Sequence, residues 1–382
     1  VVFGNFHPHK NNRILTTSDD RTARIWDISD KAYQELPSRE GTVHRGIVSG
    51  IFNPEKPSQV ITIARDGTLK YWNINDSEAS YVLTKKLGSI DDAQIDLNNP
   101  KRIATVNPTG FGKINVDKQK RRLRKRHKVE SVSFDSKNPH RILVVSGSTA
   151  TVWNIKNNGS VNLSAPPLPM NQGEFDPNDS NRLATGGADG ILRIWNLKNP
   201  TKPQKELTAS QKEIWHVSFD PKNSNRILVL GSDGLAKILN IQTGKETNLT
   251  GHTNTVAYGS FDPNNSNRVL TVSHDGTARI WNIENLGNPL ILKGSKQRLI
   301  YGIFDPKNSN RVLTVSSDGN ARIYIVGGKE LSESAWNKTS RCFSQQELSD
   351  YKLPKVQLLK TLSIYLRKSA ELLSNQKYRP YC

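Results

Sequence analysis

Short apolar runs separated by polar turns fill most of this chain, and residues 261–283 show the pattern most completely. Residues 269–273 (VLTVS) are apolar and β-branched, a composition that favours a strand. Asp275-Gly276 is typical of a tight β-hairpin turn, which needs a positive φ, and a return strand carrying Trp281 follows it. The segment therefore predicts an antiparallel unit, and such a unit cannot bury both of its faces alone.

The same unit recurs eight times along the chain. A Phe-type residue before the first loop occupies the equivalent positions Phe6, Phe52, Ile95, Phe134, Phe175, Phe219, Phe261 and Phe304. The residue that ends the hairpin is usually Trp, and its positions are Trp26, Trp72, Asn115, Trp153, Trp195, Leu239, Trp281 and Tyr324. Repeats of about 40–45 residues with several short strands each are the signature of β-propeller blades. We therefore expect an all-β fold, a β-propeller of eight four-stranded blades, or alternatively of seven with one copy outside the ring.

One copy of the repeat has a distinctive dipeptide at each of its ends. It opens with Gly-His at 251–252 and closes with Trp-Asn at 281–282, and in this it resembles a WD repeat. The likeness to the WD-repeat family extends over roughly residues 1–326. In that family a hydrogen-bonded network joins a His, an Asp, a Ser or Thr, and the Trp. The resemblance implies that the structural network here consists of His252, Ser273, Asp275 and Trp281.

We expect two domains, a WD-repeat propeller over residues 1–330 and a helical C-terminal tail over residues 331–382. The first six residues match the innermost strand of a later repeat, so the chain is expected to begin inside a blade and to be a fragment of a longer polypeptide. Residues upstream of Val1, or residues 328–332, would then complete the last blade. Short motifs in the tail resemble the tails of bacterial multidomain signalling NTPases.

The family resemblance also implies a non-catalytic platform for protein partners. Its contact positions lie six and four residues before the Phe-type residue and seven before the Trp-type residue. The chemically distinctive residues at these positions are Arg65, Asp91, Lys128, Glu130, Glu213, Trp215, His274 and Arg298. Trp215 is open to two interpretations, because a Trp is both a common interface anchor and a common packing residue between neighbouring blades.

The chain has a formal net charge of +19, part of which belongs to the repeat. An Arg lies seven residues after seven of the eight Phe-type positions, an even distribution that indicates a structural role. Residues 118–128 form a separate basic patch that consists of Lys118, Lys120, Arg121, Arg122, Arg124, Lys125, Arg126 and Lys128. This patch predicts either electrostatic binding of nucleic acid or an acidic protein surface, or a solvated edge strand whose charges prevent edge-to-edge pairing.

The sequence contains little that indicates catalysis. No phosphate-binding Gly-Lys-Ser/Thr loop, His-Glu-x-x-His or Cys-x-x-Cys motif is present, and the His residues are not spaced as metal ligands. We therefore expect no enzyme activity, no cofactor and no metal. No apolar run is long enough to span a membrane. Two cysteines, Cys342 and Cys382, provide no disulfide framework and favour a cytoplasmic location.

Overall fold

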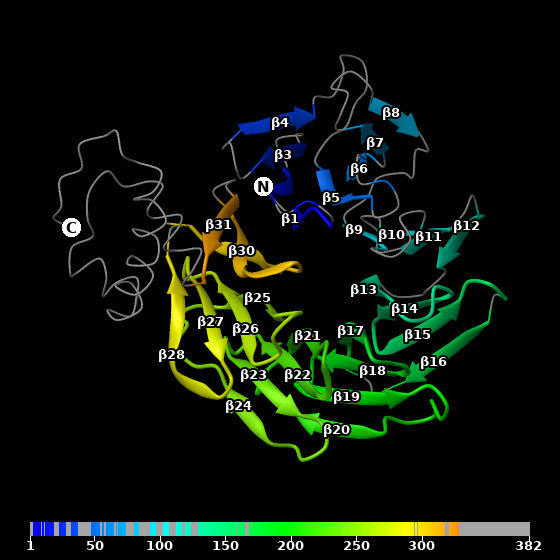
Figure 1. Ribbon diagram of the computed structural model, residues 1–382. Helices are drawn as coiled ribbons and strands as arrows, with labels where there is room; N and C mark the ends of the chain where they lie inside the picture. Colours follow the sequence, from blue (N-terminus) through cyan, green and yellow to red (C-terminus); the bar gives the residue numbers. More distant parts are fainter. Residues whose placement is uncertain are drawn as a thin grey trace, which may run out of the picture. The chain divides into compact units, whose positions relative to one another are not determined.

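The computed structural model describes a large part of the chain between residues 3 and 327. The described ranges are 3–8, 10, 12–18, 23–27, 32–36, 47–53, 56, 59–64, 66, 68–73, 80–83, 92–96, 102–106, 112–116, 119–123, 129–157, 159–164, 168–293, 295, 297–317 and 321–327. These residues form β-strands without any helix, which confirms the all-β expectation (Figure 1). No helix among them could cross a bilayer.

The strands pair into antiparallel sheets, each built from strands that follow one another in sequence. The first three sheets contain β1 (Phe3–Phe6), β2 (Arg13–Thr17), β3 (Ala23–Asp27) and β4 (Ala32–Leu36), then β5 (Ile47–Phe52), β6 (Gln59–Ala64), β7 (Leu69–Asn73) and β8 (Ser80–Leu83), then β9 (Asp92–Ile95), β10 (Ile103–Val106), β11 (Gly112–Val116) and β12 (Gln119–Leu123). The third sheet keeps the four-strand order although its sequence departs furthest from the repeat.

The next three sheets have the same order. They contain β13 (Val129–Phe134), β14 (Arg141–Ser146), β15 (Thr149–Asn154) and β16 (Ser160–Ser164), then β17 (Met170–Asp176), β18 (Asp179–Gly187), β19 (Ile191–Asn196) and β20 (Lys205–Thr208), then β21 (Ile214–Asp220), β22 (Asn223–Gly231), β23 (Ala236–Asn240) and β24 (Glu246–Asn248). Each Phe-type residue lies at or near the end of a first strand, as the repeat predicts.

Two further sheets end the described part of the chain. They contain β25 (Val256–Phe261), β26 (Arg268–Ser273), β27 (Ala278–Asn282) and β28 (Asn285–Leu292), then β29 (Leu299–Asp305), β30 (Asn308–Ser316) and β31 (Ala321–Ile325). By compactness the chain divides into a unit from Val1 to Tyr324 and a unit from Ile325 to Cys382. The expected helical tail, residues 331–382, lies outside the described residues, and the boundary at residue 330 stays a prediction.

Within the first unit, the sheets pack face to face in the order of the sequence. The first strands of successive sheets contact one another along most of this series, and β29 in turn contacts β1. The last sheet therefore packs against the first: Phe6 and Ile14 share a buried cluster with Leu313, and the Phe3 and Tyr301 rings lie 5.0 Å apart. Figure 1 shows the first strands toward the middle of this unit and the fourth strands at its periphery.

Glycine in the first strands permits this close approach of the sheets. A Cβ atom placed on Gly302 would lie 2.5 Å from Cγ2 of Val272 in the preceding sheet. One placed on Gly4 would lie 2.8 Å from Cδ2 of Leu313, across the contact between the first and last sheets. Since real Cβ contacts are longer than these distances, a larger residue at either position would push two sheets apart.

A buried Asp, an Arg and a Ser form a polar contact between neighbouring sheets, which we call the clasp. Asp262 follows β25 and is 0% exposed. Nη1 of Arg268 lies 3.3 Å from Oδ2 of Asp262 and donates a 2.8 Å hydrogen bond to the carbonyl oxygen of Ser309 in the next sheet. The Ser309 hydroxyl donates to Oδ1 of Asp262 at 2.7 Å. One carboxylate thus binds groups of two sheets.

The clasp recurs around the unit. Arg182 lies 2.6 Å from Asp176, whose other oxygen accepts a 3.1 Å hydrogen bond from the Ser224 hydroxyl of the next sheet. The Ser180 hydroxyl reaches Asp135 in the same way at 3.2 Å. The regularly spaced Arg residues of the repeat therefore have a structural role, because buried Asp partners neutralise their charge.

The clasp arginines also stack on the Phe-type residue of the following sheet. Their guanidinium carbons lie over these rings in four pairs: Arg102 over Phe134 at 5.1 Å, Arg182 over Phe219 at 5.9 Å, Arg268 over Phe304 at 5.1 Å and Arg311 over Phe6 at 6.0 Å. The pair of Arg311 and Phe6 joins the final sheet to the first through the same type of stacking that joins consecutive sheets. Each pair adds a cation–π attraction to the ion pair.

One sheet replaces the charged pair of the clasp with a neutral one. Asn53 and Gln59 stand where six other sheets have Asp and Arg, and Nδ2 of Asn53 donates a 3.0 Å hydrogen bond to Oε1 of Gln59. Asn53 is 5% exposed. A buried amide pair satisfies its polar groups without a cost for burying charge. The clasp position can therefore hold either an Asp–Arg ion pair or an Asn–Gln amide pair.

In four sheets, the Trp side chain donates a hydrogen bond to a Thr two residues beyond its cross-strand partner. Trp281 pairs with Val269, and its Nε1 donates to Oγ1 of Thr271 at 2.8 Å. The same bond has a length of 2.8–2.9 Å in three other sheets, from Trp26 to Thr16, from Trp72 to Thr62 and from Trp195 to Thr185. An indole reaches this diagonal neighbour because it is a long side chain.

The β13–β16 sheet has the Trp without its acceptor. Trp153 pairs with Ile142, so the acceptor position holds Val144, and Nε1 of Trp153 is buried without a hydrogen-bond partner. In the β21–β24 sheet both members are apolar, since Leu239 pairs with Ile227 and Val229 stands at the acceptor position. These two sheets provide a matched comparison.

We predict that Val144→Thr stabilises the protein by about 1 kcal/mol, because the new hydroxyl accepts the Trp153 N–H. The matched change Val229→Thr has no indole to bind and is expected to cost about 1–3 kcal/mol through burial of an unpaired hydroxyl. Urea-induced unfolding of both variants measures these free energies. Equal destabilisation by the two substitutions would show that the indole does not use the new acceptor.

Candidate functional site

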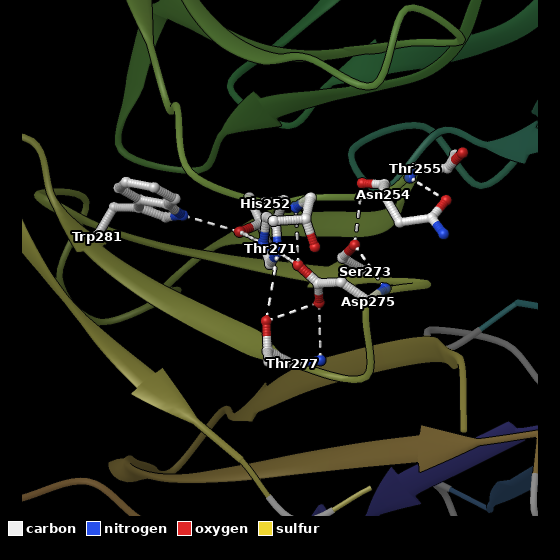
Figure 2. A network of polar contacts seen from close by, with 9 residues as sticks. His252, Asn254, Thr255, Thr271, Ser273, Asp275, Thr277 and Trp281 are labelled. Atoms are coloured by element: carbon white, nitrogen blue, oxygen red, sulfur yellow. Dashed lines mark hydrogen bonds and ion pairs between the residues drawn. The ribbon is translucent and has the colours of Figure 1, made fainter. Parts of the chain in front are cut away.

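A hydrogen-bonded network in the β25–β28 sheet fixes the loop before β25 onto the hairpin (Figure 2). His252 Nδ1 lies 2.8 Å from Oδ2 of Asp275, and His252 Nε2 lies 2.8 Å from Oγ1 of Thr271. Since that hydroxyl already accepts the Trp281 N–H, it donates its own proton to Nε2. A neutral imidazole with its proton on Nδ1 then satisfies every contact. The network joins His252, Asp275 and Trp281 through Thr271.

Ser273, the residue expected to complete this network, takes a different place. Its hydroxyl donates to the carbonyl oxygen of Asn254 at 3.0 Å and accepts the Asp275 N–H at 3.0 Å. The acceptor of the indole is Thr271, which corrects the expectation. The reason is the strand register: the diagonal neighbour of Trp281 is residue 271, and residue 273 is two positions farther toward the turn.

The network has two opposing effects on its titratable groups. Burial by itself would raise the pKa of Asp275, but hydrogen bonds from Thr277, His252 and two backbone amides outweigh this effect and lower the pKa to about 2. Burial lowers the pKa of His252, and the nearby Asp275 opposes that shift. The hairpin turn itself places Gly276 at φ 82°, as the Asp-Gly pair predicts. The arrangement holds the loop before β25 in place on the hairpin.

In other sheets the hairpin Asp has different partners, which sequence reasoning did not identify. In the β21–β24 sheet the Ser210 hydroxyl donates to Oδ2 of Asp233 at 2.8 Å, so Ser replaces His. In the β17–β20 sheet Arg193 binds Asp189 at 2.6 Å. The available signal was the Asp before each hairpin turn, which needs a partner wherever it is partly buried.

The expected partner-binding residues lie at the hairpin end of the sheets where the structure describes them. Glu130, Glu213 and Arg298 are exposed, and His274 is half-buried. Burial lowers the pKa of His274, and the nearby positive charge of Arg298 lowers it further. The structure thus brings two of these residues together, one from the β26–β27 hairpin and one from the connection into β29. Arg65, Asp91 and Lys128 lie outside the described residues.

Trp215 lies between two sheets. It packs against a buried cluster from the sheets β21–β24 and β25–β28 that includes Leu228 and Val256. Its Nε1 is buried without a hydrogen-bond partner. These contacts favour the packing interpretation over that of an interface anchor, which would present the indole to a partner.

The basic patch belongs mostly to the part of the chain that is not described. Strand β12, which includes Lys120, Arg121 and Arg122, pairs with β11, so this stretch occupies the fourth-strand position of its sheet. The side chains of this strand lie outside the described set. Lys118, Arg124, Lys125, Arg126 and Lys128 also lie outside the described residues. Among the described residues, no group of three or more His, Cys, Asp and Glu side chains could hold a metal ion.

Polar side chains on the first strands bind the backbone of the next first strand. Oε1 of Gln172 accepts the Val217 N–H at 2.7 Å, and Oε2 of Glu174 accepts the Phe219 N–H at 3.1 Å. His216 Nε2 lies 2.9 Å from the carbonyl oxygen of Gly259. A first strand has a sheet partner on one side only, so these side chains satisfy groups on its open edge.

The same row carries shifted pKa values. Burial raises the pKa of Glu174 to about 8, and nearby Asp176 adds to the shift while the Phe219 N–H opposes it. Burial lowers the pKa of His216 to about 4, against the effect of its hydrogen bond to Gly259. At neutral pH both side chains are therefore uncharged, as suits groups that make backbone hydrogen bonds in a poorly hydrated place.

We predict that Glu174→Gln changes the pH dependence of stability. The folded pKa of Glu174 lies above its ordinary value of 4.5, so its contribution is complete below pH 4.5 and is lost as the pH rises to about 8. The variant, which resembles protonated Glu, should lack this loss of up to about 1.4 kcal/mol per pH unit. Urea unfolding between pH 5 and 9 measures it; parallel curves for variant and wild type would contradict the assignment.

Three segments of the chain match the family model described as WD domain, G-beta repeat, at residues 5–27, 174–196 and 244–282. A segment of 84 residues is 30% identical to nucleoporin Nup43 of Homo sapiens, and the same identity and length hold for nucleoporin Nup43 of Mus musculus. The match covers 21% of this chain and 22% of the nucleoporin, so the chain spans about a fifth of the length of these relatives.

Two solved structures share the fold. The computationally designed Ika8 protein is 22% identical with a TM-score of 0.66, and the alignment covers 84% of this chain and 95% of that chain. The C-terminal WD40 domain of Sif2 is 14% identical with a TM-score of 0.68, over 85% of this chain and 95% of that domain. The matched segments show that the chain contains WD repeats, and the two structures show that it shares their fold.

Proposed function

We propose that this chain is a non-catalytic protein-interaction platform, whose eight described sheets are the blades of one closed propeller. WD40 propellers generally mediate protein–protein interactions. The observation that carries the proposal is the rigid hairpin end, where buried networks such as that of His252 and Asp275 fix loops that present exposed side chains of both charge signs. Mixed charge on a rigid surface favours complementary protein partners.

The eight-blade count is supported by the contact between the first and last sheets. Arg311 stacks on Phe6 as the clasp arginines do between consecutive sheets, and Leu313 packs beside Phe6 and Ile14. A seven-blade ring would leave one sheet without such neighbours. We also propose a scaffold or sensor role, a place in a larger bacterial signalling NTPase, and a cytoplasmic location.

We predict that charge reversal at the hairpin end abolishes partner binding without unfolding the protein. The variant Glu213→Lys with Arg298→Glu keeps the net charge and alters two exposed side chains. Cross-linking of tagged wild type and variant in cell extract, followed by mass spectrometry, should identify partners captured by the wild type that the variant loses by at least tenfold, with equal melting temperatures.

The matched control exchanges charge at the other end of the sheets, through Lys245→Glu with Glu284→Lys. Both residues are exposed in connections opposite the hairpins. This control should retain the partners of the wild type. Loss of the same partners from the control, together with their retention by the hairpin-end variant, would contradict the proposed surface.

A further inference from the structure

The end of the sheets opposite the hairpins carries a concentration of lysines. In an antiparallel sheet the connection from the first to the second strand and that from the third to the fourth emerge at the same end. The exposed lysines in these connections are Lys10, Lys56, Lys137, Lys156, Lys198, Lys202, Lys222, Lys245 and Lys307. Five of them, Lys10, Lys56, Lys137, Lys222 and Lys307, occupy the first connection of five different sheets. We call this set the lysine face.

Among the described residues of these connections, exposed carboxylates are fewer than exposed lysines. Among the described residues of the same connections, the exposed carboxylates are Asp179 and Glu284. Both already accept hydrogen bonds, Asp179 from the Asn181 N–H at 2.9 Å and Glu284 from the Asn267 side chain at 2.6 Å. The clasp carboxylates lie beneath this end, but they are buried and bind the clasp arginines.

The lysine ammonium groups are not used in ion pairs within the described part of the chain. Their backbone positions are nevertheless fixed. The N–H groups of Lys137, Lys222 and Lys307 each donate a 2.9 Å hydrogen bond to the clasp Asp two residues earlier. The clasp therefore holds the Cα of each lysine in place, and all three side chains are exposed, although the Lys222 ammonium also donates a hydrogen bond to the carbonyl oxygen of Asn264 in the next sheet.

The hairpin end has a different charge pattern. There the exposed Glu130 and Glu213 accompany Lys212, Lys293 and Arg298. Among the described residues the two ends of the same sheets thus differ, one with a mixture of both signs and one with nine exposed lysines against two exposed carboxylates. Surfaces whose only requirement is solubility usually carry interspersed charges of both signs. An excess of positive charge produces an electrostatic potential that attracts and orients anionic partners.

The chemistry of the lysine face narrows the class of partner. The exposed large hydrophobic residues of the described chain, Leu168, Leu235 and Ile291, all lie outside these connections. Without apolar side chains, the face cannot insert into a lipid interface or anchor a peptide. Contacts that rest on charge alone suit a partner with dense, regular negative charge, and duplex nucleic acid carries one charge per about 1.7 Å of its axis.

We infer that the lysine face binds the phosphate backbone of double-stranded nucleic acid without regard to sequence. Lysine suits this task, since its ammonium group is a mobile point charge that contacts phosphate without fixed geometry. The site is separate from the hairpin end proposed for protein partners, and none of its lysines belongs to the basic patch at residues 118–128. Its failure would leave the proposed platform function untouched.

The test measures binding of the full chain to a fluorescein-labelled 20-base-pair duplex of random sequence by fluorescence anisotropy, between 50 and 200 mM NaCl. The variant Lys222→Gln with Lys307→Gln removes two lysines from the face. Affinity at 100 mM NaCl should fall roughly tenfold, and the slope of log K against log salt should become shallower by about 2. The matched control Lys212→Gln with Lys293→Gln removes two exposed lysines at the hairpin end and should change the slope little.

Four results would overturn the inference. The wild type could fail to bind the duplex at 50 mM NaCl, or the control could weaken binding as much as the lysine-face variant. A variant with Arg121, Arg122, Arg124 and Arg126 changed to Gln could abolish binding while the lysine-face variant retains it, which would assign the activity to the basic patch. Tighter binding to polyglutamate or to phosphatidylserine vesicles than to the duplex, at equal charge concentration, would exclude nucleic acid as the favoured partner.

Discussion

The architecture depends on burying a carboxylate between two sheets and giving it partners from both. An uncompensated Asp at a position with no solvent exposure, such as Asp262, would cost several kcal/mol. The Arg of its own sheet and the Ser of the next remove that cost only when the two sheets are in register. The clasp therefore adds a directional requirement to apolar packing, which by itself would tolerate sliding. Because the clasp recurs, the same local rule applies at several contacts from one sheet to the next.

The repeat in the sequence predicted the strands and hairpins well because their determinants are local. A polar loop, a β-branched run and an Asp-Gly turn fall within about 25 residues, and strand pairing follows from their order. The even spacing of the arginines indicated a structural role, and the ion pairs with Asp176 and Asp262 agree with it. What spacing did not reveal is the partner in the next sheet. Ser224 and Ser309 look like ordinary turn residues until two repeats are placed side by side.

The network around His252 shows where resemblance alone falls short. The family pattern names a Ser or Thr, and two candidates, Thr271 and Ser273, lie on the same strand face. Only the strand register decides between them, because the indole reaches the diagonal neighbour of its partner. The same register explains why Trp153, opposite Ile142, lacks an acceptor. Surface function was less accessible to sequence reasoning, because it depends on which connections share an end of the sheets.

The two ends of the sheets illustrate how one scaffold separates structural from surface roles. Buried charge is paired within the clasp and the hairpin networks, so it contributes little to the field outside the molecule. The exposed lysines sit on the same loops as the clasp Asp residues, and the loop geometry that buries the carboxylate also projects the lysine outward. Stability and surface charge are thereby encoded in adjacent positions of a single motif.

The direct test of the clasp uses the neutral pair that the chain already contains at Asn53 and Gln59. Unfolding free energies would be measured in urea for Arg268→Gln, for Asp262→Asn and for the double variant. Arg268→Gln leaves a buried carboxylate unpaired and should cost about 3–5 kcal/mol. The double variant recreates the amide pair and should recover at least about 2 kcal/mol of that loss. A double variant that loses the sum of the two single effects would contradict the claim that a paired, buried polar contact holds the sheets in register.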